Sequence, residues 1–225
     1  MPKIVVIADD LTGGNGTGVA LTKQGLSVHT ALWEAGGPPP ELSDCDAVIY
    51  DALIVPTNSR GLSPEEAYHR VHEAARAFSS DDVFLYSKRI DSTLRGNLGS
   101  ETDALLDALG DDYIAAVIPC FPAAGRIYVG GYLLVDGVPL YRTAAATDPR
   151  NPVKTARAVQ LFAAQSKYMS TEIFLEDIAG DKDFLISRIR WMNEQGIRIF
   201  LFDAAVHGQY PFYSVESGGA VVAKA

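Results

Sequence analysis

The sequence predicts an α/β fold: a mainly parallel sheet with helices on both faces, Rossmann-like, with a small hairpin insertion. Short apolar runs alternate along the chain with helical stretches, which is the pattern of the β–α units that build parallel sheets. Residues 130–140 (GGYLLVDGVPL) interrupt this alternation and predict a hairpin with Asp136-Gly137 at its turn.

Each element follows from a local pattern. Apolar runs predict strands at residues 3–8, 26–33, 47–55, 83–86, 114–118, 172–175 and 198–202. Helical patterns cover residues 17–24, 63–78, 100–109, 152–164 and 181–195. The clearest helix start has Ser63 as N-cap, Pro64 at the first helical position and Glu66 completing a capping box. Residues 36–40 (GGPPP) predict a loop.

The composition and charge of the chain indicate which kinds of partner it is expected to bind. The chain has 225 residues, which suits one α/β domain, or one domain plus a small appendage, and 48% of the residues are hydrophobic, so a sizeable core can form. Its 19 basic and 28 acidic residues give a net charge of −9, which repels phosphate backbones and anionic lipid. We therefore expect neither nucleic acid nor membrane as a partner. The opening MPKIVVIADD has no signal-peptide pattern, so a cytoplasmic protein is expected.

The cysteines and histidines predict no metal site. Cys45 and Cys120 are far apart in the sequence and are expected to be buried, reduced thiols. The histidines show no ligand-like spacing; they are His29, His69, His72 and His207.

Four polar loops each follow a predicted strand. They are residues 9–18 (DDLTGGNGTG), 57–60 (TNSR), 88–96 (KRIDSTLRG) and 122–126 (PAAGR). In a parallel sheet these loops lie at one edge, where ligands bind. Their arginines suit a carboxylate, because a guanidinium binds a carboxylate through two hydrogen bonds. Their carboxylates suit sugar hydroxyls, and one of them could act as general base. The loops together predict a site for a polyhydroxylated acid.

Each loop also has a structural interpretation. The glycines of residues 13–18 predict either a backbone cradle for an anion or only a tight strand-to-helix connection, and they fit neither a P-loop nor GxGxxG. Adjacent Asp9 and Asp10 repel each other unless they bind something; alternatively one caps the helix and the other faces water. The other loops could be solvated or structural turns.

Three long motifs in order resemble one family. They are ADDLTGGNGTG, KRIDSTLRGN and PCFPAAGRIYVGGYLLVDGVPL, followed by DPRNPV. Together they resemble the four-carbon acid sugar kinases, which phosphorylate threonate, erythronate or oxo relatives with ATP, and the resemblance runs from Met1 to about Asp203. It implies that this chain is the substrate-binding N-terminal domain and that ATP and Mg²⁺ bind to a second domain or subunit, whose nucleotide loops have no counterpart here.

The resemblance also implies roles for individual residues. Asp10 is the expected catalytic residue. The expected substrate-binding residues are Asp9, Asp10, Thr12, Asn15, Ser59, Arg60, Lys88, Asp91, Ser92, Arg95 and Arg126. The chain departs from the family pattern DDLTGANDTG at Gly14 and Gly16, where Gly16 replaces an aspartate.

The sequence therefore predicts an acid-sugar-binding α/β domain over residues 1–205 and an atypical tail over 206–225, with the nucleotide-binding domain absent. The expected function is that of the substrate-binding domain of an ATP-dependent kinase for a four-carbon acid sugar of the threonate, erythronate or oxo-tetronate type, a domain that binds without turning over alone. The alternatives are a stand-alone acid-sugar sensor and a remnant without catalysis.

Overall fold

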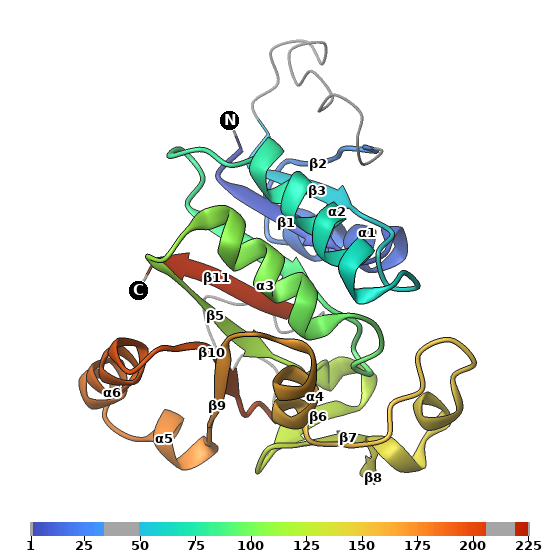
Figure 1. Cartoon of the computed structure of the whole chain (residues 1–225), viewed down its shortest axis with the longest axis vertical. Helices are drawn as coiled ribbons and strands as arrows, with labels where there is room; N and C mark the ends of the chain where they lie inside the picture. The colour runs from blue at the N-terminus through green and yellow to red at the C-terminus, as the bar shows by residue number, and fades with distance from the viewer. Residues whose placement is uncertain (1, 34–49, 206–218, 225) are drawn as a thin grey trace.

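The computed structural model describes residues 2–33, 50–205 and 219–224, and it confirms the predicted α/β fold (Figure 1). The main sheet has the strand order β2-β3-β1-β4-β11-β5-β10-β9. Its strands are β1 (Ile4–Ala8), β2 (Val28–Thr30), β3 (Ala52–Pro56), β4 (Leu85–Arg89), β5 (Tyr113–Ile118), β9 (Met169–Ile173), β10 (Ile197–Phe202) and β11 (Gly219–Lys224). Among these strands, β11 runs antiparallel to both of its neighbours and the other pairs are parallel.

Helices cover both faces of the sheet, as the sequence predicts. The helices α2 (Pro64–Ala77), α3 (Leu98–Leu109) and α4 (Ala158–Gln165) share one core with strand residues such as Val5 and Val55. The opposite face carries α1 (Leu11–Lys23) and α6 (Lys182–Glu194), which pack against Ile54 and Phe200 respectively. Figure 1 shows α2 and α3 in front of the sheet, and the short α5 (Leu175–Ala179) beside α6. Because side chains alternate along a strand, each strand end can direct neighbouring residues to opposite faces.

Helix α1 begins at Leu11, six residues before the predicted start, so most of the predicted glycine-rich loop is helical. Glycine is a poor helix former, and that lowers the expectation of a helix here. Tertiary packing overrides it. A Cβ atom added to Gly14 would lie 2.9 Å from Cγ2 of Ile54 and 3.1 Å from Cβ of Ala8. The glycine thus lets the first turns of α1 lie close against β1 and β3.

The hairpin insertion is confirmed. A separate three-stranded antiparallel sheet consists of β6 (Arg126–Val129), β7 (Tyr132–Val135) and β8 (Val138–Pro139). Asp136 and Gly137 at its predicted turn both have positive φ angles, 51° and 77°, as a type I′ turn requires. The 3₁₀ helices η2 (Pro122–Ala124), η3 (Leu140–Arg142) and η4 (Ala144–Thr147) flank this small sheet.

Helix boundaries follow local hydrogen bonding. The capping box of α2 is confirmed: the Ser63 hydroxyl accepts from the Glu66 amide, and the Glu66 carboxylate accepts from the Ser63 amide. Helix α4 begins only at Ala158, because the preceding segment bonds elsewhere. The Val153 amide donates to the Ala145 carbonyl, and the Ala156 carbonyl accepts from the Leu133 amide. These bonds hold the segment extended, so the prediction of helix from residue 152 is wrong.

The end of the chain contributes a strand that we did not predict. Val222 of β11 lies between Tyr86 and Ala115 in the sheet register, and Ala220 and Val222 are fully buried. The boundary at residue 205 stays a prediction, and residues 206–218 lie outside the described part of the chain, as do Cys45 and the loop at 36–40.

Two further findings bear on the sequence predictions. Cys120 is buried, and burial raises the pKa of its thiol to about 12. In the part of the chain that the structure describes, no helix is both long and apolar enough to span a membrane.

The packing of α1 yields a test with a matched control. A Cβ atom added to Gly16 would meet nothing within 4 Å, so G16A should raise the free energy of unfolding by about 0.5–1 kcal/mol through helix propensity. G14A gains the same propensity but crowds Ile54 and Ala8, and should be less stable than G16A. Urea denaturation of both variants measures the difference. Equal stabilisation by the two substitutions would contradict the close packing.

Candidate functional site

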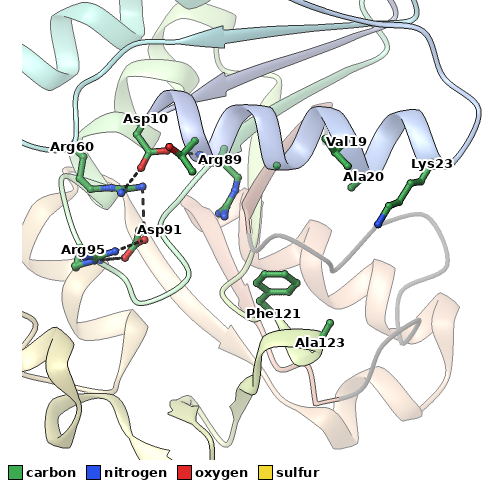
Figure 2. Close-up of a pocket in the computed structure, with 13 residues that line it drawn as sticks. Asp10, Val19, Ala20, Lys23, Arg60, Arg89, Asp91, Arg95, Phe121 and Ala123 are labelled. Carbon is green, nitrogen blue, oxygen red and sulfur yellow. Dashed lines mark hydrogen bonds and ion pairs between the residues drawn. The ribbon is translucent and has the colours of Figure 1, made fainter.

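A cavity of about 560 Å³ opens beside the carboxyl ends of β1 and β4 and the start of α1 (Figure 2). One wall is charged, and the other, from α1 and η2, is partly apolar. The lining residues are Asp10, Thr12, Gly13, Gly16, Val19, Ala20, Lys23, Arg60, Arg89, Asp91, Arg95, Phe121 and Ala123. The parallel topology thus brings residues of all four predicted loops together, at the sheet edge where α/β proteins bind ligands.

Asp9 and Asp10 point to opposite faces of the sheet. Asp10 caps α1 by accepting from the Gly13 amide, and its carboxylate lines the cavity. Asp9 continues the other face of β1 and is only 3% exposed. Its Oδ1 atom is buried and has no hydrogen-bond partner among the described residues. The predicted alternative, in which one aspartate caps the helix, holds for Asp10, whereas Asp9 does not face water.

Arg60 binds three carboxylates from two loops. Its Nε atom lies 2.7 Å from Oδ2 of Asp9, one terminal nitrogen pairs with Asp10, and the other lies 3.7 Å from Oδ1 of Asp91. Burial works against the charge of Arg60, but its hydrogen bond to Asp9 and the charges of all three aspartates raise its pKa overall. Arg60 therefore offsets the repulsion between Asp9 and Asp10 that their adjacent positions in the sequence predict.

Asp91 holds a second arginine. Nε and Nη2 of Arg95 lie 2.7 and 3.0 Å from the two oxygens of Asp91, a bidentate pair. Burial opposes the charge of Asp91, but hydrogen bonds from Arg95 and Thr93, with the charge of Arg60, lower its pKa to about 2. Asp91 therefore stays ionised across the neutral range and keeps Arg95 at the cavity wall.

Lys88 lies beneath the cavity and not in its lining. Its side chain is 0% exposed and its Nζ atom lies 2.6 Å from Oε2 of Glu101, which is 2% exposed, in α3. Nζ also donates to the Arg89 carbonyl at 2.8 Å. Burial raises the pKa of Glu101, while the charge of Lys88 lowers it, and the net shift is upward. This buried ion pair ties β4 to α3 directly behind Asp9.

The other predicted residues take different places. Thr12 lines the cavity. Ser59 is fully buried and its hydroxyl lies 2.8 Å from that of Thr57. Asn15 is exposed and accepts a hydrogen bond from the Thr30 hydroxyl at 3.2 Å.

Two more predicted residues, Ser92 and Arg126, are not among the lining residues. Arg126 donates to the Ala124 carbonyl. The substrate-binding role of these residues stays a prediction.

Several lining residues are not among the predicted site residues, and they include Arg89, Lys23 and Phe121. Figure 2 shows Arg89 extending between α1 and Phe121. The signal that could have identified Arg89 is the alternation of side chains between the two faces of a strand. We ended the predicted strand at Tyr86, but β4 continues to Arg89, so Lys88 points to the α3 side and Arg89 to the α1 side.

Residues 4–210 match the family described as "Sugar-binding N-terminal domain". This chain belongs to that family. The match covers every strand of the main sheet except β11, and every residue of the cavity.

Named relatives of the family are acid-sugar kinases. The chain is 44% identical over 218 residues to a D-erythronate kinase of Heliobacterium modesticaldum, covering 93% of this chain and 48% of that protein. It is 36% identical to a D-threonate kinase of Salmonella typhimurium, covering 78% and 40%, and 29% identical to a 3-oxo-tetronate kinase of Brucella melitensis, covering 90% and 45%. The chain thus spans about half the length of the relatives it matches, or less.

Solved structures share the fold. A Haemophilus influenzae protein superposes with a TM-score of 0.79 at 27% identity, covering 91% of this chain and 49% of that one. A Bordetella bronchiseptica protein, solved as a domain-swapped dimer with bound citrate, gives 0.73 at 27% identity, covering 92% and 48%. Family and fold thus agree with the prediction made from the three motifs.

The buried Lys88–Glu101 pair yields a stability prediction. K88M removes the cation but leaves Glu101 buried, and should lower the free energy of unfolding by about 3–5 kcal/mol. The double variant K88M/E101L leaves no uncompensated charge and should recover most of that loss. Urea denaturation at pH 7 measures both. A loss below about 1 kcal/mol in K88M would show that the pair does not support the sheet edge in this way.

Proposed function

We propose that this chain is the substrate-binding half of an ATP-dependent kinase that phosphorylates a four-carbon acid sugar in the cytoplasm. The observation that carries the proposal is the pairing of Arg95 with Asp91 at the wall of a cavity that also holds Asp10 and Arg60. The kinase names of the relatives support the same assignment.

The charges of the cavity suit a small hydroxylated acid. Arg95 is 33% exposed, so its guanidinium can reach a ligand carboxylate. The Asp10 carboxylate and the Thr12 hydroxyl lie on the same cavity and can hydrogen-bond to ligand hydroxyls. We propose that Asp10 orients the attacking hydroxyl and accepts its proton as general base, because its position is fixed by the Gly13 amide and by Arg60.

ATP and Mg²⁺ would enter this reaction from the other half of the kinase. Carboxylate oxygens are the ligands that Mg²⁺ prefers, but Asp9, Asp10 and Asp91 are all ion-paired with arginine in this chain. These residues therefore do not fit a metal–nucleotide site. Phosphoryl transfer depends on positioning and charge neutralisation, so turnover requires both halves to enclose the substrates.

Calorimetric titration of the 225-residue chain tests this function. D-erythronate and D-threonate should each give a binding isotherm, and ATP with Mg²⁺ should give none, because the charged cavity is built for a small acid. Binding of ATP–Mg²⁺ without binding of either acid would overturn the proposal.

Two arginine variants sharpen the assignment. R95A removes a guanidinium from the cavity wall and should weaken D-erythronate binding at least about tenfold, the loss of roughly one charge-assisted hydrogen bond. R76A makes the same change of charge at an exposed arginine that does not line the cavity, and its affinity should stay within about twofold of the unmodified chain. Equal losses in both variants would contradict the placement of the carboxylate at Arg95.

A further inference from the structure

The DPRNPV segment follows the hairpin insertion and contains a turn built on Asp148. Its Oδ1 atom accepts from the amides of Arg150 at 3.0 Å and Asn151 at 2.8 Å. Its Oδ2 atom accepts from Nη1 of Arg95 at 3.1 Å, although the two residues are 53 positions apart. The Asp148 side chain is 19% exposed. The two oxygens thus have separate tasks: one holds the turn, and the other reaches the cavity wall.

The Arg95 guanidinium is held on two sides. Nε and Nη2 donate to Asp91, and Nη1 donates to Asp148. A guanidinium has five N–H groups, so these three bonds leave one N–H on each terminal nitrogen. Two N–H groups on adjacent nitrogens match the two oxygens of one carboxylate. The protein carboxylates therefore leave Arg95 able to receive a ligand carboxylate.

We propose that Asp148 is a positioning residue that orders the Arg95 guanidinium before ligand binding. Asp91 pairs with only one edge of the Arg95 guanidinium, and it belongs to the same loop as Arg95. Asp148 comes from a different part of the fold and fixes a second edge, so that the group cannot swing about its bond to Asp91. A side chain ordered in advance loses less conformational entropy on binding, which increases affinity.

The proposal rests on the proposed function for the identity of the ligand, but the ordering of Arg95 is a property of the ligand-free chain. It also assigns a role to the hairpin insertion. The segment that follows the β6–β8 sheet supplies Asp148 to Arg95.

The variant D148N separates the two oxygens. An asparagine keeps an oxygen that accepts from the Arg150 and Asn151 amides, but it presents an amide group to Arg95, which cannot accept its hydrogen bond. D148N should weaken D-erythronate binding about tenfold in calorimetric titration. Loss of negative charge alone predicts the opposite, since it would favour an anion. D112N, at an exposed aspartate outside the cavity, is the matched control and should bind like the unmodified chain.

A double-variant cycle tests whether Asp148 acts through Arg95. In an R95K background, which lacks the planar fork, D148N should change the affinity less than about twofold. The same loss in both backgrounds would overturn the proposal, as would unchanged or stronger binding in D148N.

A ligand-free measurement keeps the proposal apart from the proposed function. The Nε–H resonance of Arg95, assigned by its disappearance in R95K, should show a heteronuclear NOE typical of an ordered group in the unmodified chain and in D112N. It should fall markedly in D148N. If the unmodified chain binds no acid sugar, the proposed function fails while this measurement still decides the role of Asp148. An unchanged NOE in D148N overturns it.

Discussion

The site depends on the ion pairs between Arg60 and three aspartates. Asp9 and Asp10 follow β1, Arg60 follows β3, and Asp91 follows β4, so one guanidinium connects the ends of three adjacent strands. Without it, three carboxylates would lie together at a partly buried edge, which is costly. Arg60 therefore stabilises this edge of the sheet, and its presence allows Asp10 to line the cavity in charged surroundings.

Elements with strong local signals were predicted closely. The capping box at Ser63, the turn at Asp136-Gly137 and the helix capped by Asp181 all appear within a residue or two of their predicted places. Elements that depend on distant contacts were not. Residues 11–16 are helical because Gly14 allows close packing on Ile54, and β11 is a strand because it fills a gap between β4 and β5. The periodicity of hydrophobic residues in one sequence predicts neither of these contacts.

The candidate site shows the same difference between features that the sequence predicts and features that depend on distant contacts. Parallel topology predicted which loops meet, because strand ends share an edge. It did not predict which residues face the cavity, since that depends on where each strand ends and on its alternation. Extending β4 by three residues sends Lys88 to Glu101 and Arg89 to the cavity. The DPRNPV motif predicts no role for Asp148, because its contact with Arg95 spans 53 positions and exists only in the folded chain.

An acidic chain can bind an acid when its own carboxylates orient the cations. The net charge of −9 would repel a small anion at long range, but that repulsion is screened within about 10 Å at ordinary salt. Inside the cavity, Asp91 and Asp148 hold Arg95 by three hydrogen bonds and leave two donors. In the function that we propose, binding depends on matching a short carboxylate to fixed donors and not on attraction between net charges. A site of this kind favours geometry over charge. This explains why the aspartates around the cavity outnumber the two arginines that they hold, Arg60 and Arg95.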